Sequence, residues 1–289
     1  AIVFALVMLM GIVPTQIGFS PRAMVTAFCV MVWFEEIVIV FLVPALTAGS
    51  ISIEKERQTL EVLLTTRMST WQIVTGKYFS TVSQITLLVI SGFPLLCVMF
   101  LYGGINLFQM FTILAVLISS TMFFASFGIF YSALIKNTIL SVILTYITIG
   151  VVLVATFSLT VMGMLIMVGV NEILCEVILK NTGQSVHNVI GGDAFIFLLC
   201  WNPLATLFDA IGQVFGYGIG DGASINGIKD IPIFMHFTSK NLLLRFFPFL
   251  SVGAQLLTTF LLLRAAAFFL KPVKGKKKVK KKAVNQARN

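Results

Sequence analysis

The chain has 289 residues, of which 58% are hydrophobic and only 11% are charged, and its mean hydropathy is +1.01. Because about 25% of the residues in a soluble domain are charged, this composition excludes a soluble globular protein and indicates several membrane spans. The net charge of +9 comes from one segment: residues 271–289 hold nine Lys or Arg residues and no acid, whereas the other 270 residues carry eleven of each sign. We therefore expect no nucleic-acid-binding surface.

Long apolar runs predict the membrane helices, since a helix needs about 20 apolar residues to cross a bilayer core. Residues 1–13 are apolar but too short, and they have no basic segment typical of a signal peptide. We interpret them as the end of a first helix that begins before Ala1. The other expected spans are 23–48, 69–101, 108–135, 138–170 and 246–270. The prediction is an all-α integral membrane protein with six transmembrane helices in one permease domain, residues 1–270.

The region 171–245 alternates polar patches with short apolar runs. Residues 195–200 and 204–215 are too short to cross, which predicts re-entrant or interfacial helices packed against protein. Trp201, Asn202 and Pro203 mark the break between them, because Pro ends the preceding element. The run before this region, 138–170, is longer than one crossing requires, and we expect it to bend or end near Gly150, Gly163 or Gly169.

Charge asymmetry predicts the orientation, because cytoplasmic loops carry excess Lys and Arg. Lys77, Lys136, Arg264 and the tail fall on the same expected face as the charged segment 49–71, whereas region 171–245 holds six acids. We therefore expect both termini inside and region 171–245 outside. The tail at 271–289 is expected to attract anionic lipid headgroups, each basic residue contributing about 1 kcal/mol; a solvated tail is the alternative.

The sequence contains no pattern for catalysis, metal binding or nucleotide binding. No Cys and His residues cluster with metal-ligand spacing. A disulfide between Cys175 and Cys200 stays open, because sequence alone does not give the pairing. The phosphate-binding pattern GxxxxGK[ST] does not occur. We therefore expect neither an enzyme nor a cofactor bound by this chain.

Residues 49–71 form an island of charge between two apolar runs, and such charge cannot lie in lipid. Thr59 is a suitable N-cap and Glu61 suits the positive start of a helix. The apolar residues that follow recur at helical spacing and share one face; they are Leu60, Leu63 and Leu64. The pattern predicts a short amphipathic helix at the membrane surface, although an ordinary cytoplasmic loop is the alternative.

The string Ser52-x-Glu54-x-Glu56-Arg57-x-Thr59-Leu60-Glu61-x-Leu63-Leu64, followed by Ser69, Ile73, Gly76 and Lys77, resembles the signature of ABC-2-type transporter permeases. Gln58 and Arg67 depart from it, standing where Gly and Pro are frequent. The resemblance implies that 49–71 is a coupling helix that docks on a separate cytoplasmic ATPase subunit, which holds ATP and Mg²⁺. Its charged residues would steer docking and its leucines would anchor it.

The resemblance also implies a second permease subunit, identical or related, with the translocation path at the interface between the two. It implies an exporter in the plasma membrane of a bacterium, with Trp201, Asn202 and Pro203 in an outer gate. Hydrophobic lining would suit an amphipathic or hydrophobic substrate such as a peptide, lipid or drug. A membrane anchor or sensor for a cytoplasmic ATPase is an alternative that transports nothing.

Glu35 and Glu36 lie halfway along an expected span, where an ionised carboxylate costs at least about 2.5 kcal/mol. Neighbouring residues of a helix point about 100° apart, so the two side chains cannot face one narrow cavity equally. We expect one to face the translocation path or the dimer seam and to bind a proton or a cationic group. If one of them binds a proton during transport, the chain could be a proton-coupled secondary carrier, which is a further alternative for its function. The alternative role for these two residues is structural, as a protonated or hydrogen-bonded carboxyl between helices.

Overall fold

The computed structural model describes residues 21–59, 69–101, 106–182, 192–214 and 247–270. Throughout these ranges the regular structure is helical, without a strand, which confirms the predicted all-α class. The elements are α2 (Pro21–Thr47), α3 (Ser52–Glu56), α5 (Thr70–Leu101), α6 (Leu107–Leu134), α7 (Thr138–Thr182), the 3₁₀ helix η1 (Gly192–Trp201), α8 (Pro203–Val214) and α10 (Phe247–Phe269).

Five of these helices are long and apolar enough to cross a membrane: α2, α5, α6, α7 and α10. They correspond to the five expected spans after residue 13, and all boundaries but one agree to within about two residues. The expected first helix, residues 1–13, lies outside the described residues, so the total of six spans stays a prediction.

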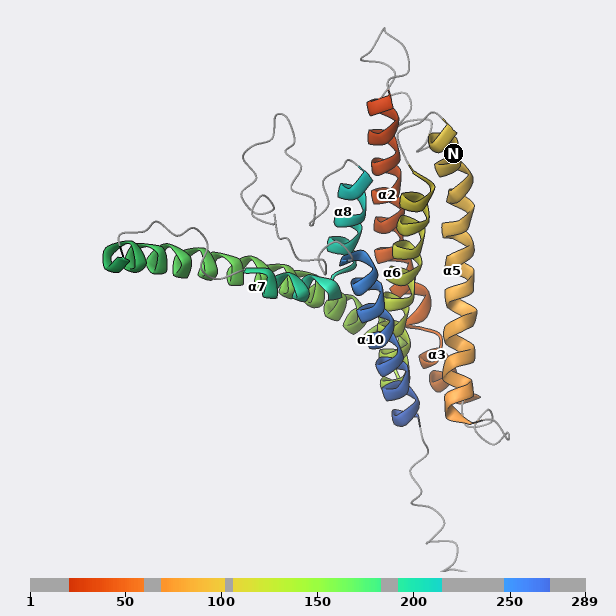
Figure 1. Cartoon of the computed structure of the whole chain (residues 1–289). Helices are drawn as coiled ribbons and strands as arrows, with labels where there is room; N and C mark the ends of the chain where they lie inside the picture. Colours follow the sequence, from red (N-terminus) through yellow and green to blue (C-terminus); the bar gives the residue numbers. More distant parts are fainter. Residues whose placement is uncertain (1–20, 60–68, 102–105, 183–191, 215–246, 271–289) are drawn as a thin grey trace, which may run out of the picture.

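Helix α6 is the centre of the bundle and packs against α2, α5, α8 and α10 (Figure 1). It is buried over most of its length and carries no charged residue. Its large core side chains include Ile113, Leu117 and Phe124, and serines occupy several of its other buried positions. Small polar side chains let neighbouring membrane helices approach closely and hydrogen-bond. The centre of this bundle is therefore partly polar.

Helix α5 begins where the sequence predicts, because Ser69 and Gln72 form a reciprocal cap. The Gln72 amide donates to Ser69 Oγ at 3.3 Å, and the Ser69 amide donates to Gln72 Oε1 at 2.9 Å. Asn106 and Gln109 cap α6 in the same way. These caps satisfy backbone donors that a helix start leaves unpaired.

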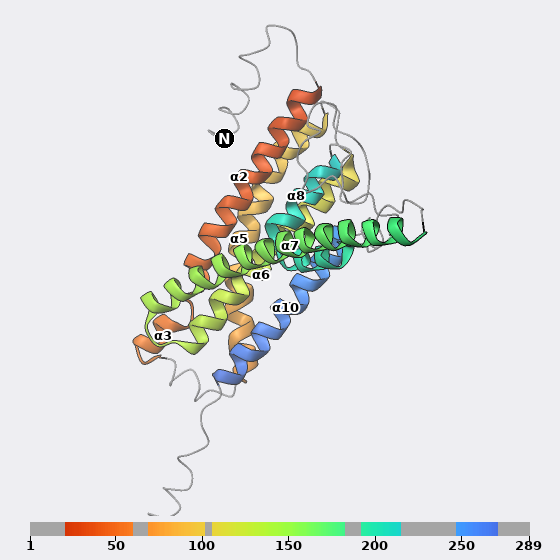
Figure 2. The same ribbon diagram turned by 90° about the vertical axis from the view of Figure 1, so that its left-hand side faces the viewer.

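Helix α7 is one continuous helix of 45 residues, and the predicted end of this span at residue 170 is wrong. The helix does not end at Gly150, Gly163 or Gly169, and it includes the first residues assigned to region 171–245. The first polar residues beyond 170 are Asn171 and Glu172, and residues of these types weaken a helix by well under 1 kcal/mol each and do not stop it. The outer part of α7 projects away from the bundle (Figures 1 and 2).

The two short helices predicted before the last span are present as η1 and α8, with 10 and 12 residues. Neither is long enough to cross a bilayer core. They pack against each other and against α10, while η1 also contacts α7 and α8 also contacts α6. Their position relative to the membrane surface stays a prediction.

Candidate functional site

The charged island begins with α3, a helix of five residues placed just beyond the end of α2. Three consecutive charged residues of α3 each bond to a different membrane helix. We call Glu54, Lys55 and Glu56, together with the groups that they contact, the α3 clasp. The contacts of its three members follow in chain order.

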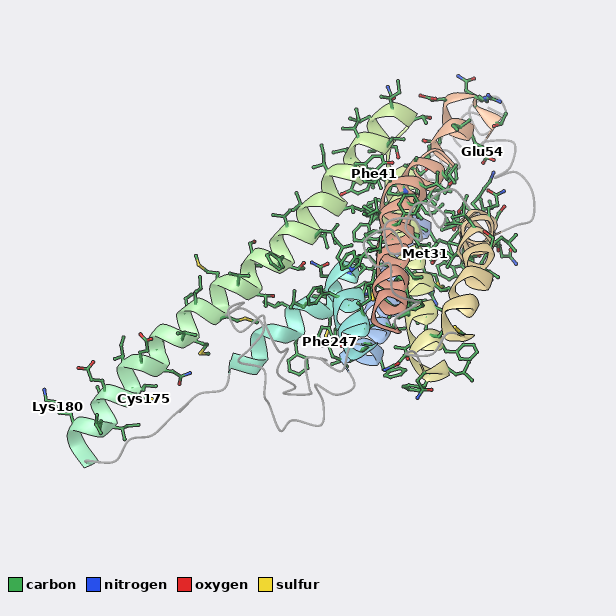
Figure 3. All side chains as sticks on the ribbon, turned by 90° about the horizontal axis from the view of Figure 1, so that it is seen from above. Met31, Phe41, Glu54, Cys175, Lys180 and Phe247 are labelled. Carbon is green, nitrogen blue, oxygen red and sulfur yellow. The ribbon has the colours of Figure 1, made fainter. Side chains whose placement is uncertain are left out.

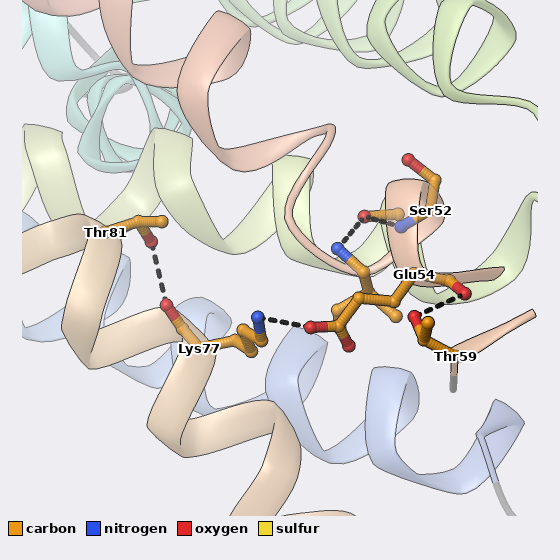
Figure 4. Close-up of polar contacts among 7 residues, drawn as sticks. Ser52, Glu54, Thr59, Lys77 and Thr81 are labelled. Carbon is orange, nitrogen blue, oxygen red and sulfur yellow. Dashed lines mark hydrogen bonds and ion pairs between the residues drawn. The ribbon is translucent and has the colours of Figure 1, made fainter. Parts of the chain in front are cut away.

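Glu54 connects α3 to the start of α5. Its Oε1 lies 2.5 Å from Lys77 Nζ, and Lys77 is only partly exposed (Figure 4). The Thr59 hydroxyl donates to the Glu54 backbone carbonyl at 3.3 Å, which ties the end of the described island back to α3. Glu54 is therefore occupied by a contact within the chain.

Lys55 connects α3 to the C-terminal end of α6. Its ammonium donates to the backbone carbonyls of Ser132 and Ala133. The Ser132 hydroxyl oxygen in turn accepts from the amides of Ile51 and Ser52, each at 2.8 Å. A cation at the last carbonyls of a helix is favourable, because those carbonyls lack helical partners and carry partial negative charge.

Glu56 connects α3 to the N-terminus of α7. Its two carboxylate oxygens accept from the Thr138 amide at 3.0 Å and from the Thr138 hydroxyl at 2.8 Å. Asn137 Oδ1 accepts from the amides of Ile139 and Leu140 and completes the cap. An anion at this position also complements the positive end of the helix dipole.

Gln58 has a φ of 59°, in the left-handed region that favours glycine. Its amide donates to the Lys55 carbonyl at 3.3 Å, as expected for the residue that follows a helix C-cap. Gln58 stands where the ABC-2 pattern often has Gly. Among the described non-glycine residues, it is the one with a positive φ.

The remaining predicted docking residues divide into two groups. Arg57 and Thr59 are exposed at the surface of the molecule, next to the clasp. Leu60, Glu61, Leu63 and Leu64 lie outside the described residues. The predicted apolar face of the coupling helix therefore stays a prediction. The predicted cap, in which Thr59 would accept from backbone amides of that helix, stays one as well.

Of the basic residues that the sequence assigns to the same membrane face as the charged segment 49–71, the three that the structure describes, Lys77, Lys136 and Arg264, gather at the α3 end of the bundle. Lys77 pairs with Glu54, and Lys136 lies close to Lys55. The Arg264 guanidinium stacks 4.8 Å from the ring centre of Trp71 at the start of α5. The grouping of these residues agrees with the prediction, while the side of the membrane on which they lie is still a prediction.

Glu35 and Glu36 point to different helices, as their spacing predicts. The Glu35 carboxylate lies against Gly92 of α5, where an added Cβ would be 3.1 Å from Oε1. Glu36 is fully buried and lies beside Ser120 of α6. Neither Glu36 oxygen has a hydrogen-bond partner among the described residues. The two carboxyls therefore do not form one site.

Asn202 is buried and organises the predicted break between η1 and α8. Its Oδ1 accepts from the amides of Leu204 and Ala205, which caps α8, and Pro203 takes the first helical position. Its Nδ2 donates to Thr156 Oγ1 and to the Leu153 carbonyl of α7. Trp201 is exposed. The break predicted at Trp201, Asn202 and Pro203 is confirmed, and a gate there stays a proposal.

A buried hydrogen-bonded chain joins this break to the bundle centre. The Thr206 hydroxyl donates to the Asn202 carbonyl at 3.1 Å, and Gln255 Nε2 of α10 donates to Thr206 Oγ1 at 3.3 Å. Ser119 of α6 donates to Gln255 Oε1 at 2.9 Å. Such chains hold membrane helices together, each bond contributing about 0.6–2 kcal/mol. Gln255 was not singled out from the sequence, although an amide inside an apolar span is a usable signal.

Three of the four cysteines are unpaired: Cys29, Cys175 and Cys200. Cys175 in α7 and Cys200 in η1 are both free thiols, so the disulfide that the sequence left open does not form between them. Within the described ranges, no group of three or more Cys, His, Asp or Glu side chains could hold a metal ion.

No family model and no curated protein matches this chain.

Proposed function

We propose that this chain is the membrane-spanning permease subunit of an ABC exporter of the ABC-2 type. One observation carries the proposal: the α3 clasp attaches three successive charged residues to α5, α6 and α7. A force applied to α3 would therefore reach three membrane helices at once. This is the mechanical requirement for a coupling element that receives the motion of an ATPase.

The proposal assigns different roles to the island residues. Glu54 and Glu56 hold the clasp, because their carboxylates are engaged inside the chain. Arg57 and Thr59 are exposed and lead into the docking segment with Leu60, Glu61, Leu63 and Leu64. The ATPase would bind this segment, and ATP and Mg²⁺ would be held by the ATPase. A second permease subunit would complete the path for an amphipathic or hydrophobic substrate.

In this mechanism, ATP-driven closure of two ATPases draws the two coupling segments together. Lys77, Ser132 and Thr138 transmit that displacement to the ends of three helices. The break at Trp201, Asn202 and Pro203 forms the outer gate, held to α7 and α10 by Asn202 and Gln255. The substrate moves outward when the bundle tilts.

A photo-crosslinking experiment tests the docking role. The full chain carries a photoreactive residue in place of Arg57, and the control carries it in place of Leu257, which is exposed in the middle of α10. After illumination of intact membranes, we expect mass spectrometry to identify an ATPase with the GxxxxGK[ST] pattern only at the first position. We also expect ATP to change the crosslinking yield.

A charge exchange tests the clasp itself. Glu54→Lys should uncouple ATP hydrolysis from substrate efflux, and Glu54→Lys with Lys77→Glu should restore coupling, because the pair is rebuilt with opposite polarity. If no ATPase crosslinks at Arg57, the exporter assignment is wrong, and the proton-coupled carrier with Glu35 or Glu36 becomes the leading alternative. An ATPase that binds without any substrate efflux would indicate the anchor or sensor.

A further inference from the structure

Glu36 is an ionisable side chain that the coupling mechanism does not use. It lies in the apolar middle of α2 and has no exposed surface. Both carboxylate oxygens are buried without a hydrogen-bond partner among the described residues. Buried polar groups almost always have partners, so this side chain needs a physical explanation.

Among the described residues, the helices that pack against α2 supply no cation close to Glu36. Helix α2 packs against α5, α6, α7 and α8. No charged residue occurs in α6. The basic residue of α5, Lys77, pairs with Glu54 near the start of that helix, and the charged residues of α7 lie in its outer part. The other carboxyls on these elements near the bundle are Glu35, which lies against Gly92, and the buried Asp209 of α8.

Ser120 of α6 lies beside Glu36, and its hydroxyl would favour a carboxylate if it donated to it, but that hydroxyl donates to the Val116 carbonyl at 3.0 Å. Its hydroxyl oxygen remains free to accept a hydrogen bond. A carboxylate has only acceptors, whereas a protonated carboxyl has one donor. The local chemistry therefore suits a neutral acid and opposes an anion.

The energy of burying a charge also favours the neutral acid. An ionised carboxylate that is buried without a partner costs several kcal/mol, and a group in this position takes up a proton instead. Ionisable residues inside a membrane are rare and are candidates for functional sites, and Asp and Glu side chains there serve in proton relays. We propose that Glu36 is an intramembrane proton-binding site, neutral while α2 and α6 are packed together, and that it releases its proton only when these two helices separate.

The location gives this site a mechanical consequence. Glu36 lies on the helix that leads directly into α3, and its carboxyl lies at the contact between α2 and α6. Ionisation requires water to reach the carboxyl, and water can reach it only if that contact opens. Proton occupancy and α2–α6 packing are therefore linked. This inference does not rest on the exporter proposal, because the carboxyl is buried whether or not an ATPase binds.

Infrared spectroscopy of the purified full chain in lipid tests the proposal at neutral pH. The spectrum of Glu36→Gln is subtracted from that of the wild type. We expect the difference to contain the carbonyl stretch of a protonated carboxyl and to lack carboxylate bands. The matched control is Glu35→Gln, which changes the neighbouring acid. The spectrum of this variant should still contain the carbonyl stretch of the Glu36 carboxyl. Carboxylate bands in the Glu36 difference would overturn the proposal.

Thermal unfolding provides a second test, with Glu36→Met as a neutral variant of similar size should the amide variant not fold. A carboxyl that holds its proton when folded and releases it when unfolded makes the folded state bind more protons. Stability then falls as the pH is raised from acidic to alkaline values. We expect the Tm of the wild type to fall more steeply over this range than the Tm of either Glu36 variant. If the Tm of the wild type and of the Glu36 variants changes with pH in the same way, Glu36 binds no extra proton in the folded state.

Discussion

At the scale of single residues, Gly128 sets the distance between α2 and α6. A Cβ at this position would lie 1.9 Å from Thr47 Oγ1 and 3.0 Å from the backbone nitrogen of Ala48. The second of these atoms belongs to the backbone and cannot move aside as a flexible side chain would. Ala48 leads into α3, so the missing side chain at Gly128 also determines where the clasp begins.

Gly128→Ala should lower the free energy of unfolding by about 1–3 kcal/mol, because the added methyl group overpacks a closed contact. The matched control is Gly150→Ala in α7, where an added Cβ would meet no atom within 4 Å. That variant should be neutral or gain up to about 1 kcal/mol from helix propensity. Unfolding of both variants in detergent by denaturant or heat measures the difference, and equal stabilities would contradict the close approach.

Two features at this scale follow directly from the sequence. The divergence of Glu35 and Glu36 follows from helix geometry alone, since consecutive residues differ by about 100°. The departure at Gln58 from a position that favours Gly coincides with a positive φ. The sequence does not indicate which of the two carboxyls is buried. That depends on which neighbouring helix is the centre of the bundle, and Glu36 is buried because it faces the central helix α6, whereas Glu35 faces α5.

At the scale of elements, the α3 clasp holds a helix that is too short to be stable alone. Five residues cannot form a stable helix in water. Its position depends on contacts with other elements, and Ser132 is central among them. One hydroxyl oxygen accepts from two consecutive amides, those of Ile51 and Ser52, and both residues are buried.

Ser132→Ala should destabilise the clasp by about 1–3 kcal/mol for each buried amide that loses its acceptor. The control is Ser158→Ala in α7, where the exposed hydroxyl bonds only to the Ala155 carbonyl of its own helix. That change should stay within about 0.5 kcal/mol. Hydrogen exchange at Ile51 and Ser52 measures the local effect. Unchanged protection in Ser132→Ala would show that another group can take over as acceptor.

Sequence patterns within a few residues predicted the starts of helices well. They could not predict which residues the charged island contacts. The reciprocal cap of Ser69 and Gln72 spans three residues, so the sequence pattern contains the whole interaction. The bond from Glu56 to Thr138 joins residues 82 positions apart. Such a pairing depends on how α6 returns the chain to α3, which no local pattern specifies. Glu54 and Glu56 were therefore predicted to face a partner, although the structure engages both within the chain.

At the scale of the whole molecule, α7 is too long for one crossing. Its 45 residues extend about 67 Å, more than twice the roughly 30 Å of a bilayer core. The outer part carries large exposed apolar side chains such as Leu165 and Ile166, followed by the charged Glu172, Glu176 and Lys180. Figure 3 shows Cys175 and Lys180 at the end of α7 that is remote from the bundle.

The native thiols offer a test of this arrangement. Because Glu172 and Glu176 flank Cys175 and cannot lie in lipid without cost, we expect Cys175 to be in water beyond the membrane core. In a Cys97→Ser background, a charged maleimide that cannot cross membranes should modify Cys175 in intact cells, on the face predicted to be external. Cys29 and Cys200 are buried and should react only after denaturation.

The outcome distinguishes three arrangements of α7. Labelling of Cys175 from outside places the remote end of the helix in external water, as the charge distribution predicts. Labelling only from the cytoplasmic side of inverted vesicles would reverse the predicted orientation. Protection from both sides until denaturation would mean that the exposed face of α7 is covered in the membrane.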